Sequence, residues 1–211
     1  MHIITMTLGA LGTNCYIVAS DKKDAAIIDP ADDFEAIRSR LEKESLTPQL
    51  LLLTHGHYDH LLAAQKLSEA YGLPVCVHEG DLSKMTNPME NLHGYFNAQE
   101  DFEPIRNVQT FSDGDELAFD EIALRVLYTP GHTGGSVCFL CGNDFFSGDT
   151  LFEGSIGRTD MPDGDYMTMM GSLQKITDLL GDYRIYPGHG KMTTLNRERR
   201  ENLFLTGIGG I

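Results

Sequence analysis

Five of the eight histidines in this sequence stand in three short glycine-containing loops, one of which also carries an acid. The loops read Thr54-His55-Gly56-His57-Tyr58-Asp59-His60, Pro130-Gly131-His132-Thr133 and Pro187-Gly188-His189-Gly190, and Ser147-Gly148-Asp149-Thr150 adds a further carboxylate. Neutral imidazole and carboxylate are ligands that zinc, iron and manganese accept in proteins. A lone histidine is more often structural than ligating, but this grouping indicates a metal centre.

The spacing of these residues divides them between two metal ions. His55 and His57 lie two residues apart in an extended segment, so their side chains project the same way and can bind one ion. Asp59 and His60 follow at the turn into an expected helix and can face a second ion. The expected ligands are His55, His57 and His132 for the first ion, Asp59, His60 and His189 for the second, and Asp149 for both.

A pair of such ions predicts hydrolytic chemistry. Two divalent ions ~3.5–4 Å apart can hold a bridging hydroxide, because they lower the pKa of bound water from ~15.7 to ~7. They also stabilise the negative charge that develops when the hydroxide attacks. We therefore expect two divalent metal ions, with zinc as the first choice and iron or manganese as alternatives.

Each loop follows a segment with the character of a β-strand, and a rigid sheet can direct such loops into one cleft. The expected strands are 2–8, 15–20, 25–30, 49–54, 74–77, 108–111, 116–119, 122–128, 136–140, 144–149 and 184–190. The expected helices are 33–43, 60–71, 165–180 and 198–203. This order favours a single α/β domain over residues 1–211, in which two sheets pack face to face with helices outside.

The charge and the apolar pattern exclude several classes of protein. There are 16 lysines and arginines against 31 acids, so the net charge is −15. Binding to nucleic acid or to anionic lipid needs a cationic face, and we expect neither. The N-terminal residues lack the basic and long apolar regions of a signal peptide, and no apolar run reaches the ~18 residues of a membrane span. We expect a cytoplasmic protein; the sequence leaves its oligomeric state open.

The four cysteines do not extend the metal centre. Cys138 and Cys141 form a C-x-x-C string within an apolar run that reads as a strand. Residues three apart on a strand point to opposite faces, so these thiols should not share a ligand. We expect all four cysteines to be reduced and buried, which suits a cytosolic protein.

The least regular part of the sequence is the segment 79–107, which is rich in asparagine, proline and glycine. Long segments without regular structure in a compact domain are often lids over an active site. A plain surface excursion is the alternative, and the sequence leaves both readings open.

The strings THGHYDH, TPGHTGGS, SGDT and YPGHG, in this order and spacing, resemble those of the metallo-β-lactamase-fold hydrolases. Three further segments, 13–16, 151–160 and 193–205, resemble the short, single-domain bacterial type of glyoxalase II (hydroxyacylglutathione hydrolase). The resemblance covers essentially the whole chain. It implies an αββα sandwich of two mixed β-sheets, and its motifs match the seven ligands named above.

The resemblance also implies an activity. The enzyme would hydrolyse an S-acylglutathione thioester, such as S-lactoylglutathione, with the hydroxide that bridges the metal ions. Asp59 would be a catalytic residue, a metal ligand that also orients the hydroxide. Arg158 falls where the family carries a basic residue that binds the glycine carboxylate of glutathione; a surface arginine paired with Asp160 or Asp163 is the alternative.

Other functions remain open at this stage. Two-domain glyoxalase II enzymes append a helical domain that supplies much of the glutathione site, and only about twenty residues follow His189 here. A persulfide dioxygenase would hold a single iron with His55, His132 and Asp149 alone. A lactonase or β-lactamase could use the same centre, and a non-catalytic module stabilised by zinc is the alternative from another class.

Overall fold

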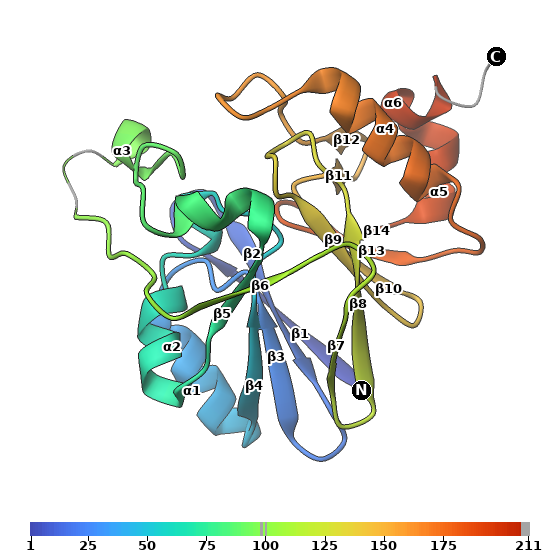
Figure 1. The fold of residues 1–211 in the computed structure, drawn as a ribbon. Helices are drawn as coiled ribbons and strands as arrows, with labels where there is room; N and C mark the ends of the chain where they lie inside the picture. The colour runs from blue at the N-terminus through green and yellow to red at the C-terminus, as the bar shows by residue number, and fades with distance from the viewer. Residues whose placement is uncertain (98, 100, 208–211) are drawn as a thin grey trace.

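Two mixed β-sheets pack face to face at the centre of the molecule, and helices cover both outer faces (Figure 1). The computed structural model, which describes residues 1–97, 99 and 101–207, thus confirms the expected αββα sandwich. The first sheet contains, in spatial order, β1 (His2–Leu8), β2 (Thr13–Ala19), β3 (Asp24–Ile28), β4 (Thr47–Leu52), β5 (Val75–His78) and β6 (Val108–Phe111). The second contains β14 (Thr193–Thr194), β13 (Arg184–Pro187), β10 (Asp144–Gly148), β9 (Val137–Cys141), β8 (Ile122–Tyr128) and β7 (Glu116–Phe119).

The helices lie in two groups, one on each sheet (Figure 1). The first sheet is covered by α1 (Phe34–Glu44) and α2 (Ala64–Tyr71), and the second by α4 (Tyr166–Thr177), α5 (Leu195–Glu201) and α6 (Leu203–Thr206). Shorter elements are η1 (Tyr58–His60), η2 (Glu79–Met85), α3 (His93–Phe96) and the hairpin of β11 (Leu151–Phe152) and β12 (Ser155–Ile156). Among these described helices, none combines the length and the hydropathy needed to cross a bilayer.

The alternation of side chains along each strand explains how the first sheet contributes to two apolar layers. In β2 every residue is buried, with Ile17 facing the layer of α1 and α2, and Tyr16 and Val18 facing the second sheet. Successive side chains on a strand point to opposite faces, so a strand that is covered on both sides needs an unbroken apolar run. Leu51 and Leu52 of β4 divide in the same way.

The cysteines behave as the strand reading predicts. Cys138 packs in the layer of α4, whereas Cys141 packs between the two sheets. All four cysteines are free and buried, and burial raises the pKa of the Cys138 thiol to about 12. The C-x-x-C string therefore takes no part in a metal site.

The helix expected over 60–71 begins later than predicted. Residues Tyr58–His60 form the 3-10 turn η1, and the regular helix starts only at Ala64. The Tyr58 N–H donates to the carbonyl oxygen of Asn91, 2.9 Å away, so a contact far along the chain fixes the start of this turn. The consequence is that Asp59 and His60 stand on a tight turn and not on a helix.

The prediction of one helix over 198–203 was wrong. Two short helices, α5 and α6, meet there at Asn202. The Asn202 side-chain oxygen accepts a hydrogen bond from the Phe204 N–H at 3.0 Å and caps the second helix. Its amide nitrogen donates to the carbonyl oxygen of Ser155 at 3.1 Å. A capping side chain thus breaks an apolar pattern that periodicity alone reads as one helix.

One edge of the sandwich collects the chain segments that follow several strands. In the first sheet, β3 and β4 run parallel, so both end at the same edge. In the second, β10 and β13 are parallel, and β8 shares their direction because β9 is antiparallel to both of its neighbours. The loops after β4, β8, β10 and β13 are those that carry the histidines and acids singled out from the sequence.

Candidate metal centre

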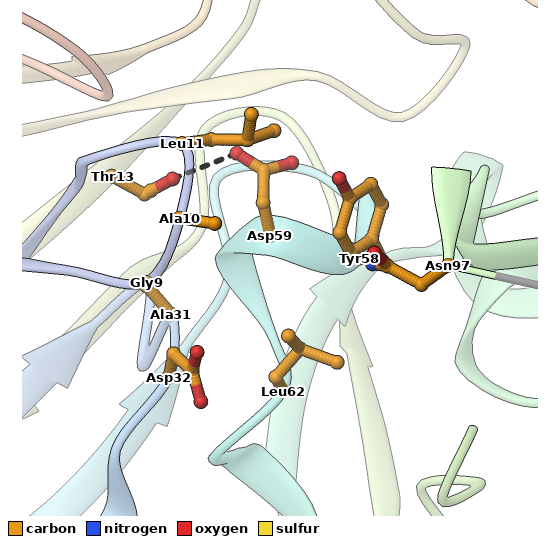
Figure 2. A pocket seen from close by; sticks show the side chains of 10 residues that line it. All are labelled: Gly9, Ala10, Leu11, Thr13, Ala31, Asp32, Tyr58, Asp59, Leu62 and Asn97. Atoms are coloured by element: carbon orange, nitrogen blue, oxygen red, sulfur yellow. Dashed lines mark hydrogen bonds between the residues drawn. The ribbon is translucent and has the colours of Figure 1, made fainter. Parts of the chain in front are cut away.

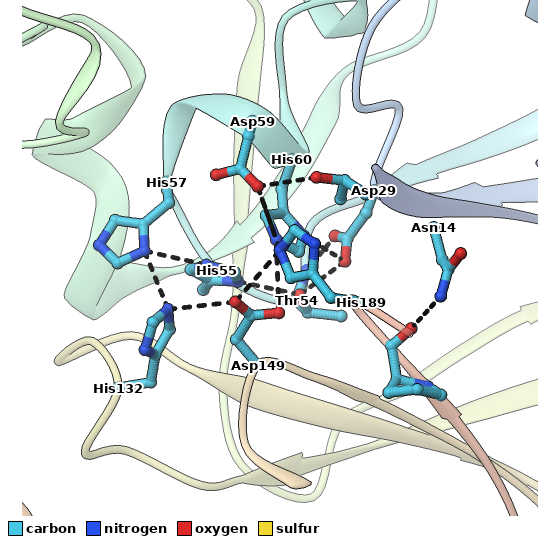
Figure 3. A network of polar contacts seen from close by, with 12 residues as sticks. Asn14, Asp29, Thr54, His55, His57, Asp59, His60, His132, Asp149 and His189 are labelled. Carbon is cyan, nitrogen blue, oxygen red and sulfur yellow. Dashed lines mark hydrogen bonds and ion pairs between the residues drawn. The ribbon is translucent and has the colours of Figure 1, made fainter. Parts of the chain in front are cut away.

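The structure brings together all seven side chains that the sequence singled out as ligands (Figure 3). They come from both sheets and from positions as far apart in the chain as His55 and His189. The clusters whose ligand atoms all lie within 4.8 Å of one another are His55, His57 and His132; His55, His60 and Asp149; and Asp59, His60 and His189. These overlapping clusters form one continuous centre.

The first cluster consists of three imidazoles. Nδ1 of His57 lies 3.1 Å from Nε2 of His55 and 2.9 Å from Nε2 of His132. His55 and His57 project to the same side of an extended segment, while the loop after β8 brings His132 from the opposite sheet. The arrangement gathers three ring nitrogens around one point.

The second cluster contains acids as well. Oδ2 of Asp59 lies 3.2 Å from Nε2 of His189 and 3.5 Å from Nε2 of His60. Asp149 stands between the two clusters: its Oδ1 is 3.4 Å from Nε2 of His60, and its Oδ2 is 3.5 Å from Nε2 of both His132 and His189. A single carboxylate therefore contacts both clusters.

Outward hydrogen bonds fix which ring nitrogens face inward. Nδ1 of His132 donates to the carbonyl oxygen of Arg158 at 2.8 Å, because a carbonyl can only accept. Nδ1 of His60 donates in the same way to the carboxylate of Asp29 at 2.9 Å. On such a ring in its neutral form, the nitrogen that faces the centre carries a lone pair. Such outer partners are what orient histidine ligands in metal sites.

Asp29 is a functional residue that the sequence reasoning missed. It is buried and takes a left-handed conformation with φ of 51° directly after β3. Its carboxylate accepts hydrogen bonds from the N–H and the hydroxyl of Thr54, both at 2.7 Å, as well as from His60. Thr54 in turn lies 3.1 Å from Nδ1 of His55. The available signal was an acid at the end of a strand parallel to the one that precedes the first histidine loop.

The residues present fit a bound cation. Nε2 of His60 and Oδ1 of Asp149 are buried, face each other, and have no hydrogen-bond partner within the described residues. Buried polar atoms are seldom left unpaired, and a shared cation would satisfy both. Gly188 supports this arrangement, because a Cβ there would collide with the Asp149 carboxylate and the His60 ring.

The electrostatics differ between the two sides of the centre. Burial, with a further contribution from His132, lowers the pKa of His57 to about 3, so this imidazole is neutral. Burial also acts to lower the pKa of His60, but the carboxylates of Asp59 and Asp149 outweigh it and raise the value to about 9. The side of the centre at His57 therefore offers the lone pair of a neutral imidazole. The side at His60 offers the negative charge of Asp59 and Asp149, which attracts cations.

The first residues of β2 hold the last histidine loop in place. The Thr13 hydroxyl donates to Oδ2 of Asp59 at 2.7 Å, which leaves that carboxylate oriented toward the centre. The Tyr16 hydroxyl and the Asn14 amide both donate to the carbonyl oxygen of Pro187, at 2.6 Å and 3.0 Å. Hydrogen bonds from the first sheet thus hold the loop that leads to His189 in the second sheet.

A second buried acid that the sequence reasoning missed ties the two histidine loops together. Asp81, at the start of η2, is fully buried and accepts hydrogen bonds from the N–H groups of Gly56 at 2.7 Å and Gly135 at 2.9 Å. It also accepts from the Thr133 hydroxyl at 2.7 Å and pairs with Lys84 at 2.9 Å. Asp81 therefore joins the loop after β4 to the loop after β8.

A cavity of about 260 Å³ opens beside the centre, and its wall includes His57, Asp59, His132, Asp149 and His189. Its other lining residues are Leu11, Tyr58, Leu92, Phe96, Arg158 and Met161. A neighbouring hollow shares Leu11, Tyr58 and Asp59 with it and extends toward Asp32 (Figure 2). The candidate ligands are therefore accessible from a space that could admit a small molecule.

Arg158 lies in the wall of this cavity and is also paired with an acid. Its guanidinium donates from Nε and Nη2 to the two oxygens of Asp160, at 2.9 Å each, and its side chain is 65% exposed. Asp163, the other acid considered as a partner, instead pairs with Lys84 at 2.6 Å. An anion that binds Arg158 from the cavity would have to compete with Asp160.

Residues 8–189 match the sequence model of the metallo-beta-lactamase superfamily. The chain belongs to this superfamily. A relative in Haemophilus influenzae, named hydroxyacylglutathione hydrolase GloC, is 36% identical, with 97% of this chain and 98% of that protein covered. The structure of the BLEG-1 B3 metallo-beta-lactamase is 33% identical with a TM-score of 0.92, covering 98% of this chain and 100% of that one.

A third comparison concerns the metal. TTHA1623, whose structure was solved in a di-iron-bound form, is 36% identical to this chain with a TM-score of 0.86, and the match covers 96% of this chain and 100% of that one. Membership of the superfamily agrees with the resemblance drawn from the four loops. The His/Asp cluster of this chain has the donor atoms of a metal site.

We expect Asp81→Asn to destabilise this superfamily member strongly. The amide would place N–H donors against N–H donors and would leave Lys84 without one of its two carboxylate partners. Breaking a buried charged network of this kind costs about 3 kcal/mol of unfolding free energy. Urea unfolding would measure the loss. Glu35→Gln, the same chemical change in an exposed pair on α1, is the matched control, and equal effects of the two substitutions would contradict this role for Asp81.

Proposed function

We propose that this protein is a metal-dependent hydrolase that cleaves an S-acylglutathione-type thioester. The observation that carries the proposal is the convergence of seven imidazole and carboxylate side chains, in overlapping clusters with Asp149 between them, beside an open cavity. The relative named hydroxyacylglutathione hydrolase supports the choice of substrate, since it matches this chain over almost its whole length.

Two divalent ions would be held by this chain's own residues. His55, His57 and His132 would hold one, Asp59, His60 and His189 the other, and Asp149 would serve both. The mixture of nitrogen and carboxylate donors suits zinc, while iron and manganese accept the same set. When bound, such ions polarise a carbonyl oxygen and activate water at neutral pH.

In this reaction the protein's own residues position the reacting groups and orient the attacking water. Thr13 fixes one oxygen of Asp59, and we assign Asp59 the additional catalytic role of orienting the attacking water. Attack on the thioester carbonyl carbon forms the new C–O bond, and the C–S bond then breaks to release a thiolate. A thiolate is a fair leaving group, so the site needs no strong general acid next to the sulfur.

A second candidate function is hydrolysis of a β-lactam or a lactone. It is favoured by the BLEG-1 comparison, since that structure is named a B3 metallo-beta-lactamase. The persulfide dioxygenase and the non-catalytic zinc module are separated from the hydrolases by measurement: the former consumes oxygen, and the latter turns over no substrate.

A substrate panel tests the proposed function directly. We expect the zinc-loaded protein to hydrolyse S-lactoylglutathione, to lose this activity on chelation and to regain it when zinc is added back. Thioester hydrolysis can be followed by released thiol, with a β-lactam and a lactone as competing substrates. Glutathione persulfide is given to the iron-loaded protein at an oxygen electrode, because the dioxygenase reaction needs iron. Turnover of the persulfide with oxygen uptake, or turnover of no substrate at all, would refute the thioesterase.

We expect Asp59→Asn to lose one metal ion per chain and to lower kcat by about 100-fold, because it removes a ligand that also orients the reacting water. Metal analysis and steady-state kinetics on the same preparation would measure both effects. Asp21→Asn makes the same change on an exposed side chain that pairs only with the N-terminus, and it should change neither. Full activity with a single ion would contradict the dinuclear scheme.

Arg158→Ala tests the proposed carboxylate contact. We expect it to raise KM about fivefold for an anionic glutathione thioester but not for a neutral thioester of N-acetylcysteamine, because an exposed ion pair is worth little and only the anion uses it. Asp160→Asn frees the guanidinium and should lower KM for the anionic substrate. An equal change for both substrates in Arg158→Ala would reject the role.

A further inference from the structure

We propose that the cavity beside the metal centre binds an apolar acyl chain, so that the enzyme prefers alkanoyl thioesters to small hydroxyacyl thioesters. This inference rests on the proposed thioesterase function and adds the identity of the acyl group to it. The residues that would determine this specificity are Leu11, Leu92, Phe96 and Met161.

The four side chains come from three separate parts of the chain. Leu11 lies in the turn between β1 and β2, Leu92 and Phe96 belong to the irregular segment before and within α3, and Met161 follows β12. All four line the cavity that is also lined by five of the candidate ligands. Apolar residues that gather at a concave site with a few polar groups are typical of a ligand pocket.

Two of these four side chains are exposed, and Leu92 forms a buried part of the wall. Leu11 is 56% exposed and Phe96 is 58% exposed, although each has other members of the pocket beside it. Large apolar side chains that are exposed together, next to polar residues with a chemical role, mark a binding surface. Here the surface adjoins the centre where a substrate carbonyl would sit, so its occupant is the part of the substrate next to that carbonyl.

The backbone at Leu92 is strained in a way that keeps this surface in place. Leu92 has φ of 71°, in the left-handed region that a branched side chain seldom adopts. Its carbonyl oxygen accepts the N–H groups of Tyr95 at 3.1 Å and Phe96 at 3.2 Å, so the strained residue starts α3. Residues held in such conformations cluster at ligand sites. Phe96 in turn stacks on Tyr58 with a ring separation of 6.2 Å.

The distribution of charge decides which part of a thioester fits this wall. A glutathionyl group carries two carboxylates and an ammonium, which would lose their hydration against apolar side chains. Among the described residues that line the cavity, Arg158 is the one arginine or lysine, and Asp160 already binds its guanidinium. The glutathionyl arm therefore lies toward Arg158 and solvent, and the acyl arm lies on the apolar wall.

A chain-length series tests the inference. We expect kcat/KM of the zinc-loaded enzyme to rise from S-acetyl- through S-butanoyl- to S-hexanoylglutathione, by up to about fourfold for each methylene that the wall buries. S-lactoylglutathione, with its hydroxyl, should be a poorer substrate than S-butanoylglutathione. Phe96→Ala should reduce the hexanoyl-to-acetyl ratio about tenfold, and Phe96→Leu should restore most of it. A ratio within one variant does not depend on how much of the protein is correctly folded.

Binding of unreactive thioethers tests the acyl-chain inference without depending on catalysis. Calorimetry with the thioethers S-methyl-, S-butyl- and S-hexylglutathione on the chelated protein should show Kd falling with chain length, and falling less in Phe96→Ala. Leu180→Ala, which truncates a leucine that is 91% exposed and outside the cavity lining, should behave as the unchanged protein. A flat or falling series, or an unchanged ratio in Phe96→Ala, would overturn the acyl-chain inference while leaving the thioesterase intact. Hydrolysis of no thioester would overturn the proposed function itself.

Discussion

The structure depends on holding several buried nitrogen and oxygen atoms close together, and two of them, Nε2 of His60 and Oδ1 of Asp149, have no hydrogen-bond partner among the described residues. The inner face of the centre presents ring nitrogens of His55 and His132 to His57, and a carboxylate oxygen of Asp149 to His60. Burying such atoms without partners is costly, so their positions must be imposed from outside. The outward ring nitrogens of His60 and His132 are accordingly bonded to groups that can only accept.

That imposed arrangement explains why buried acids lie behind the centre as well as in it. Asp29 joins the end of β3 to the loop after β4, within one sheet, while Asp81 joins that same loop to the loop after β8 in the other sheet. Asn14 and Tyr16 make a comparable link to Pro187. The two sheets are thus held by apolar packing through most of their interface and by directed hydrogen bonds at the edge where the centre lies. Hydrogen bonds fix register and orientation, which apolar packing alone does not.

The sequence predicted the parts of this site that are local. The histidine loops could be read because each carries its ligands within a few residues of a strand end, and the sheet then brings the loops together. Asp29 and Asp81 could not be read in this way, because the backbone N–H groups they bind lie 25 to 54 residues away. The late start of α2 has the same origin, since the Tyr58 N–H is bonded to Asn91. The order of strands and helices along the sequence is enough to predict the sandwich architecture. The long-range polar contacts form only in the folded chain, so the sequence does not predict them.

The strong negative charge of the protein affects metal binding, whereas the composition of its cavity affects substrate binding. An excess of acids raises the local concentration of cations and favours loading of the centre, but it disfavours an anionic substrate. Bound cations reverse the sign of the field only close to the centre, within reach of a carbonyl oxygen. Beyond that reach the cavity offers mostly uncharged surface, with Leu92 and Met161 in its lining, and one guanidinium already neutralised by Asp160. On the proposed function, discrimination between acyl groups along this wall would therefore come from the fit of apolar groups.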